Sequence, residues 1–316
     1  MTELFKTDVT PGRRHRRMAE STESAGSTVP RRQLGRHLRE LRTSVGLTIE
    51  AAADLMQWSF AMLQRIEKGQ VDKVRDVDVK ELCRIYQAEP GEVEGLIGLA
   101  RQANAPEWWH AYGNVIPDKF DVYMGLENSA KRLTLYQSEL VPGLLQTPRY
   151  ARTQIPVGLP GEPPSEIERR VQLRIKRQSL VSRSVEPLQL DVVIHESVLR
   201  TVIGSREIMA EQLKALADAS TRPNVSLRIL PFEAGYPTGN QIGPFTIMEF
   251  GTDRKGRPLE PPVVYIEGFT GALYIDRPKT VQHYSDAYEV VKRAALDTQA
   301  SRRLLRELAK EFGREQ

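Results

Sequence analysis

The sequence predicts a multidomain chain with an N-terminal all-α domain of five helices and a C-terminal α+β domain built on a small mixed or antiparallel sheet. Three observations predict this fold class. At 316 residues the chain is too long for one small core. Five short segments between residues 31 and 103 repeat apolar residues at helical spacing. Beyond residue 118, alternating runs typical of strands lie between helical segments.

Composition divides the chain into three regions. Residues 1–30 combine the basic cluster PGRRHRR with a small polar tract. Neither composition supports a packed core, so we expect a disordered basic arm. Residues 31–103 hold the helical domain. The stretch NAPEWWHAYGNVIPDKF then changes the character of the sequence, and residues 104–316 form the second domain.

The stretch from Leu47 to Gly69, LTIEAAADLMQWSFAMLQRIEKG, contains two short helices joined by a tight turn. Thr48 and Ser59 stand where a hydroxyl caps each helix, and Gly69 ends the second because glycine enters the left-handed region freely. Helices this short are marginal in water, so they require packed neighbours. The neighbouring apolar stripes are Leu34, Leu38 and Leu41 before the stretch, and Val79, Leu82, Ile85, Val93, Leu96 and Ala100 after it.

These residues resemble the lambda-repressor-like, Xre-type helix-turn-helix. The matching positions are Leu47, Thr48, Glu50, Ala53, Ser59, Leu63, Ile66, Glu67 and Gly69. The chain departs from the usual pattern at two positions. Ile49 stands where a phosphate-binding Gln is common, and Gln57 stands where the turn usually has Gly. The resemblance implies that the chain binds double-stranded DNA and that its second short helix lies in the major groove.

The resemblance also implies which side chains contact DNA, namely Thr48, Ser59, Phe60, Ala61, Gln64, Arg65 and Lys68. Arg65 has paired donors for guanine O6 and N7, and Gln64 suits adenine. Phe60 and Ala61 offer only apolar contact with thymine methyl groups. Thr48 and Lys68 would contact phosphates. The alternative is a structural helical hairpin whose polar side chains are merely solvated.

Positive charge is concentrated beside this motif. The whole chain carries a net charge of +4, yet residues 1–43 alone hold ten Lys and Arg against five Asp and Glu. Such an excess fits a surface that meets phosphate. Within the arm, the cluster Arg13, Arg14, Arg16 and Arg17 either contacts DNA as a mobile arm or is a disordered tail with incidental charge.

The second half predicts its own set of elements. Helical periodicity covers residues 121–130, 206–219, 278–295 and 299–312. Strands are expected at 188–194, 225–230, 245–250, 263–267 and 272–275, with a further extended stretch at RLTLYQSE. Ser165 and Glu168 fit a capping box at the start of an Arg-rich helix. The stripe Leu304, Leu305, Leu308 and Phe312 either docks on its own domain or forms a dimer or partner surface.

This half resembles the C-terminal domain of an actinobacterial group of Xre-type regulators that carries the VPGLLQT motif. The segments that carry the resemblance are Trp109–Tyr112, Leu126–Ala130, Val141–Arg152, Arg174–Gln178, His195–Arg200, Gln212–Leu216, Pro223–Pro231 and Val263–Glu267. The resemblance implies a transcriptional regulator that is often paired with a small partner protein. The main alternative is an antitoxin-like protein-interaction module that sequesters such a partner.

Polar and aromatic residues in this half predict a pocket for a small effector. The candidates are Trp109, Glu127, Tyr136, Tyr150, Arg174, Arg177, Gln178 and Glu196. Alternatively, Arg174 and Arg177 form salt bridges with Glu127 or Glu196 that only hold helices on the sheet. Trp109, with its neighbour Trp108, either packs between the domains or lines a ligand site.

No motif predicts catalysis, a metal or a cofactor. Phosphate-cradling glycine loops, metal-spaced His or Cys pairs and a nucleophile elbow are all missing from the sequence. His195 and Ser197 are the nearest approach to a base and a nucleophile, but we expect side chains this close in sequence to point different ways. We therefore expect a protein that is not an enzyme.

Partners and location follow from general constraints. A single reading helix contacts few bases, so we expect a homodimer on two half-sites. The one cysteine, Cys83, excludes an internal disulfide and suits a reducing compartment. There is no apolar run of membrane-spanning length and no apolar signal region, so the prediction is a cytoplasmic protein without a membrane partner.

Overall fold

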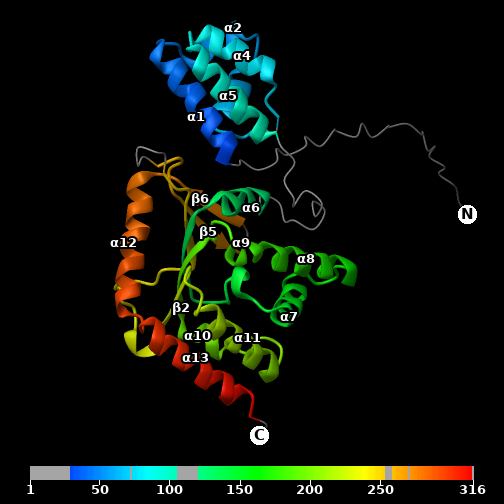
Figure 1. The fold of residues 1–316 in the computed structure, drawn as a ribbon, viewed down its shortest axis with the longest axis vertical. Helices are drawn as coiled ribbons and strands as arrows, with labels where there is room; N and C mark the ends of the chain where they lie inside the picture. Colours follow the sequence, from blue (N-terminus) through cyan, green and yellow to red (C-terminus); the bar gives the residue numbers. More distant parts are fainter. Residues whose placement is uncertain (1–28, 72, 105–119, 253–257, 270, 315–316) are drawn as a thin grey trace, which may run out of the picture.

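The computed structural model describes residues 29–71, 73–104, 120–252, 258–269 and 271–314. It contains a helical domain of five helices followed by an α+β domain with a six-stranded mixed sheet (Figure 1). This architecture confirms the predicted fold class. The arginines of the predicted arm and the Trp108–Trp109 pair lie outside the described residues.

The helical domain has the element order that the apolar stripes predict. Its helices are α1 (Val29–Ser44), α2 (Ile49–Leu55), α3 (Phe60–Glu67), α4 (Asp76–Ile85) and α5 (Pro90–Ala103). Leu38, Leu63 and Leu82 are fully buried at the centre of one hydrophobic core, and Cys83 is buried with them. Because every helix contributes apolar side chains to this core, the two short helices are held by packing.

Gly35 lets α1 pack closely against α3. A Cβ at this position would lie 2.4 Å from the carbonyl oxygen of Ile66 and 2.6 Å from that of Glu67. No side chain fits at such distances, so the helix backbones themselves are in contact. The position of the last turn of α3 is therefore set by the glycine of α1.

The sheet of the second domain has the strand order β3-β2-β1-β4-β5-β6. The first three strands in this order are parallel and the others antiparallel. The strands are β1 (Arg132–Gln137), β2 (Gln189–His195), β3 (Val225–Leu230), β4 (Phe245–Glu249), β5 (Val263–Gly268) and β6 (Gly271–Ile275). All five predicted strands and the extended stretch are thus present.

The helices of this domain cover both faces of the sheet. They are α6 (Phe120–Ser129), α7 (Pro148–Gly158), α8 (Pro164–Arg177), α9 (Ser179–Ser182), α10 (Glu196–Arg200), α11 (Arg206–Ala219), α12 (Pro278–Ala294) and α13 (Thr298–Phe312), with short 3-10 turns η2 (Gly143–Leu145) and η3 (Phe232–Ala234). Side chains alternate along β2, so that Val192 faces the core with α11 and α13 and Val193 faces α12. Figure 1 shows α12 running along one side of the sheet.

Two further predictions have clear outcomes. The stripe on α13 docks on its own domain, because Leu305, Leu308 and Phe312 are buried in the core that α11 shares. The capping box at Ser165 is wrong, since α8 begins at Pro164 with Pro163 as its N-cap, two residues before Ser165, and Glu168 instead pairs with Arg152 of α7. Proline at the first helical position needs no donated cap. Among the described helices none is long and apolar enough to cross a membrane.

Gly35→Ala should destabilise the helical domain by about 3 kcal/mol, because the added methyl meets backbone atoms that move only with α3. Hydrogen exchange of the α1–α5 amides measures this loss separately from the second domain. Gly95→Ala on α5 is the matched control, since no described atom lies within 4 Å of its Cβ position and alanine favours a helix by about 0.5–1 kcal/mol. Equal protection in both variants would show that the α1–α3 contact is looser than described.

Candidate nucleic-acid interface

The helix-turn-helix is built locally as its sequence predicts. The hydroxyl of Thr48 accepts a hydrogen bond from the amide of Ala51, and that of Ser59 accepts one from Met62, both at 3.2 Å. Gln57 adopts a left-handed conformation with φ of 55°, so the turn forms without the usual glycine. Gly69 has φ of 65° and ends the second helix as expected.

The outer face of helix α3 exposes both polar and apolar side chains to solvent. Ala61, Arg65 and Lys68 are exposed at helical spacing, and Phe60 is 42% exposed at the start of the helix. Gln64 is half-buried. The guanidinium of Arg65 contacts only the sulfur of Met62, at 3.8 Å, among the described residues. The side chains that the resemblance assigns to base reading thus lie together on one accessible helix.

A buried ion pair fixes the orientation of this helix. Arg42 of α1 donates two hydrogen bonds to the Glu67 carboxylate at the end of α3, at 2.6 and 3.0 Å. Its third donor reaches the carbonyl of Leu47, just before α2, at 2.6 Å. The hydrogen bonds from Arg42 to the Glu67 carboxylate raise the pKa of Arg42, which favours the charged form of this guanidinium. One side chain therefore ties α1, α2 and α3 together.

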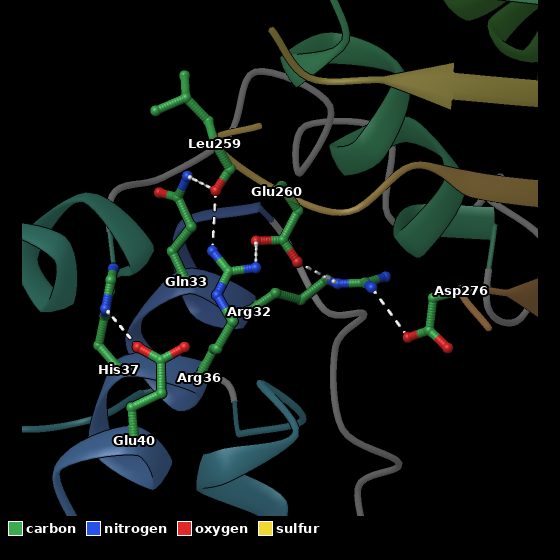
Figure 2. A network of polar contacts seen from close by, with 8 residues as sticks. All are labelled: Arg32, Gln33, Arg36, His37, Glu40, Leu259, Glu260 and Asp276. Atoms are coloured by element: carbon green, nitrogen blue, oxygen red, sulfur yellow. Dashed lines mark hydrogen bonds and ion pairs between the residues drawn. The ribbon is translucent and has the colours of Figure 1, made fainter. Parts of the chain in front are cut away.

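A second ionic cluster connects the two domains (Figure 2). Arg32 contacts the Glu260 carboxylate at 3.1 Å and Asp276 at 3.1 Å, and Arg36 contacts Glu260 at 3.0 Å. Gln33 and Arg36 also donate to the carbonyl of Leu259, at 3.1 and 2.8 Å. The sequence analysis missed this cluster. Arg32 and Arg36 are visible as a basic pair one turn apart, but their acidic partners lie more than 220 residues away in the chain.

The residues assigned to an effector pocket are distributed over several places. Glu127 and Arg177 form a buried bidentate ion pair, with both hydrogen bonds at 2.7 Å. The Arg177 guanidinium also lies 5.1 Å from the Phe120 ring and 5.3 Å from the Tyr123 ring. Burial, together with the Glu127 charge, raises the pKa of Tyr123 well above its usual range. This pair matches the alternative in which salt bridges hold helices on the sheet.

The other candidates do not join that pair in one cavity. Tyr136 packs against Phe245 on the face covered by α12, while Tyr150 is buried in the core on the opposite face. Glu196 pairs with Arg200 and accepts from the amide of Phe232. Trp109 lies outside the described residues. Their role as ligand-binding residues stays a prediction.

Arg174 has an unusual environment for a charged group. One of its nitrogens donates to the side-chain oxygens of Gln146 and Gln154, at 2.7 and 2.8 Å. No described carboxylate lies within ion-pair distance of it. Burial and, to a smaller extent, the neighbouring charge of Arg177 lower the pKa of Arg174 to about 10, although the Glu267 carboxylate acts in the opposite direction. Gln178 completes the surroundings by donating to the carbonyls of Gly143 and Gln146.

His195 and Ser197 are in contact, contrary to expectation. The Nδ1 atom of His195 lies 2.7 Å from the Ser197 hydroxyl and accepts from the Ser197 amide, because His195 caps α10. The hydroxyl in turn donates to the carbonyl of Ser138 at 2.9 Å. Both side chains therefore have structural partners. Within the described residues no group of three or more His, Cys, Asp or Glu is placed to hold a metal ion.

Arg177→Met should destabilise the second domain by about 3–5 kcal/mol, because it leaves the Glu127 carboxylate buried without a partner. Urea unfolding followed by hydrogen exchange in α6 and α8 measures the loss. Arg152→Met is the matched control, since its pair with Glu168 is roughly half-exposed and screened by water. If both variants lose similar stability, the buried pair does not hold these helices.

The fold and this surface define the chain as a helix-turn-helix protein of the DNA-binding class. In agreement, a family model described as a helix-turn-helix domain matches residues 33–96. A second model, described as a domain of unknown function (DUF5753), matches residues 120–307. The chain belongs to this DUF5753 family, whose model covers more than half of it. No curated protein and no solved structure matches the chain significantly.

Proposed function

We propose that the chain is a sequence-specific transcription regulator of the Xre type that acts as a homodimer in the cytoplasm, by binding and not by catalysis. The observation that supports this proposal is the accessible outer face of α3. Arg65 is exposed without an acidic partner among the described residues, on a helix whose position is fixed by Gly35 and by the Arg42–Glu67 pair. Such a rigid, exposed helix meets the geometric needs of major-groove reading.

Arg65→Ala should weaken binding to the preferred DNA site by about 1–3 kcal/mol and relax the choice of base at one position, because a bidentate contact with guanine is lost. Selection from random DNA followed by affinity measurement tests both effects. Arg84→Ala is the matched control, since Arg84 is an exposed arginine on α4 that pairs with Glu81.

The same experiment separates the regulator from an antitoxin-like interaction module. The observation that favours the second function is the exposure of Phe60 and Ala61, two apolar side chains on the face expected to read DNA. If selection from random DNA enriches no sequence and Arg65→Ala changes nothing, base reading is excluded. A small protein that co-purifies with the wild type and is lost from Phe60→Ser would then support sequestration.

The C-terminal domain is proposed to sense an anionic effector. Arg174 supports this role, because its part-buried guanidinium has only amide hydrogen-bond partners, and no described carboxylate lies within ion-pair distance of it. It lies against the residues of the VPGLLQT segment, including Gly143 and Gln146. A carboxylate or phosphate group on a ligand would supply the missing charge.

Small anions should therefore raise the melting temperature of the wild type but not that of Arg174→Gln. Citrate and inorganic phosphate are suitable probes at constant ionic strength, and differential scanning calorimetry provides the measurement. Arg170→Gln serves as the control, because Arg170, on the same helix as Arg174, already pairs with Glu162 in the turn before that helix. Equal increases in the melting temperature of all three proteins would show that Arg174 does not bind the anion.

A further inference from the structure

Three arginines follow one flank of α1. Arg32, Arg36 and Arg39 recur at intervals of four and three residues, which places them on one side of the helix. This flank borders α3, because the adjacent Gly35 abuts the carbonyls of its last turn. In addition, a Cβ on Gly69, just beyond α3, would lie 2.8 Å from the Arg32 amide nitrogen. The arginines therefore stand beside the C-terminal end of the helix proposed to read DNA.

Two of these three arginines are occupied by carboxylates of the other domain. Glu260 is only 3% exposed and lies between Arg32 and Arg36, while Asp276 takes the other end of Arg32 (Figure 2). A guanidinium group recognises a carboxylate and a phosphate through the same paired donors. The carboxylates of Glu260 and Asp276 thus bind the same guanidinium donors that phosphate oxygens would bind.

The contact between Glu260 and the arginines buries a carboxylate, which loses favourable hydration. Burial raises the pKa of Glu260, and the two arginine charges only partly oppose that effect. A buried carboxylate gains its net stabilisation as the small difference between attraction and lost hydration. A contact of this kind is open to competition from another anion. Duplex DNA presents a dense row of phosphates that can compete for the same guanidinium groups.

We propose that Arg32 and Arg36 are phosphate-binding residues of the DNA site, and that Glu260 and Asp276 occupy their guanidinium groups when DNA is absent. This inference rests on the proposed DNA-binding function. Docking of the second domain on α1 and binding of α1 to DNA then exclude each other. The second domain lowers DNA affinity, and any ligand or partner that shifts Leu259 and Glu260 raises it.

The test uses the full chain and a random-sequence duplex, because phosphate contacts are independent of sequence. Glu260→Gln keeps the size of the side chain and removes its charge. Its affinity should rise roughly tenfold, as for a competent state populated about one time in ten. The slope of log affinity against log salt should stay close to that of the wild type, because both proteins bind DNA through the released state, in which the two arginines contact phosphates. Glu168→Gln, which breaks a salt bridge within the second domain, is the matched control.

A double-mutant cycle assigns the gain to the arginines. Arg32→Gln with Arg36→Gln should lower affinity and flatten the salt slope, and adding Glu260→Gln to this pair should change neither. Small-angle scattering without DNA should show a larger radius of gyration for Glu260→Gln, and circular dichroism should show unchanged helix content. These two measurements separate release of the domains from unfolding.

The outcomes distinguish this inference from the proposed function. If Arg65→Ala weakens binding to a selected site but Glu260→Gln binds random duplex as the wild type does, the arginines are interdomain contacts only and the inference is wrong. A lower affinity for Glu260→Gln overturns it as well. If neither the wild type nor Glu260→Gln binds any duplex, the DNA-binding function itself fails and the inference fails with it.

Discussion

The contact between α1 and α3 sets the orientation of the helix that is proposed to bind DNA. Helix α3 is only eight residues long and has no independent stability in water. Its direction is set by Gly35, which brings the two backbones into contact, and by the buried pair of Arg42 with Glu67. The first is a steric limit and the second a directional charge interaction. Together they define where the exposed side chains of α3 point.

Helix α1 therefore makes contacts on three of its sides. Its apolar side, with Leu34 and Leu38, belongs to the core of the helical domain. Its α3-facing flank carries the contacts that orient the reading helix. Its outer arginines reach the second domain through Glu260 and Asp276. One helix therefore carries the contacts to the core, to α3 and to the second domain.

The local features were predictable from sequence because their causes are local. The caps at Thr48 and Ser59, the end of α3 at Gly69 and the strand alternation depend on residues a few positions apart. The predicted capping box at Ser165 is wrong because the prolines before it start the helix two residues earlier, with Pro163 as the N-cap. The partners of Arg32 and Arg177 depend on tertiary packing. Charge alone offered Arg177 two acids, Glu127 and Glu196, and only the fold places the first beside it.

The buried ionic groups of the chain differ in how completely they are paired, and that difference separates structural from adaptable sites. Arg42 and Arg177 each meet one carboxylate in bidentate geometry, and both partners of each pair are buried. Glu260 instead shares two arginines that approach from a half-exposed flank of α1. A fully buried pair stays together, because separating its partners would leave an uncompensated charge in the protein interior. A pair at a domain boundary is free to exchange its partner, since water and other anions reach the arginines as soon as the domains part. The structure thus places its rigid ion pairs inside domains and its exchangeable one between them, beside the helix proposed to meet DNA.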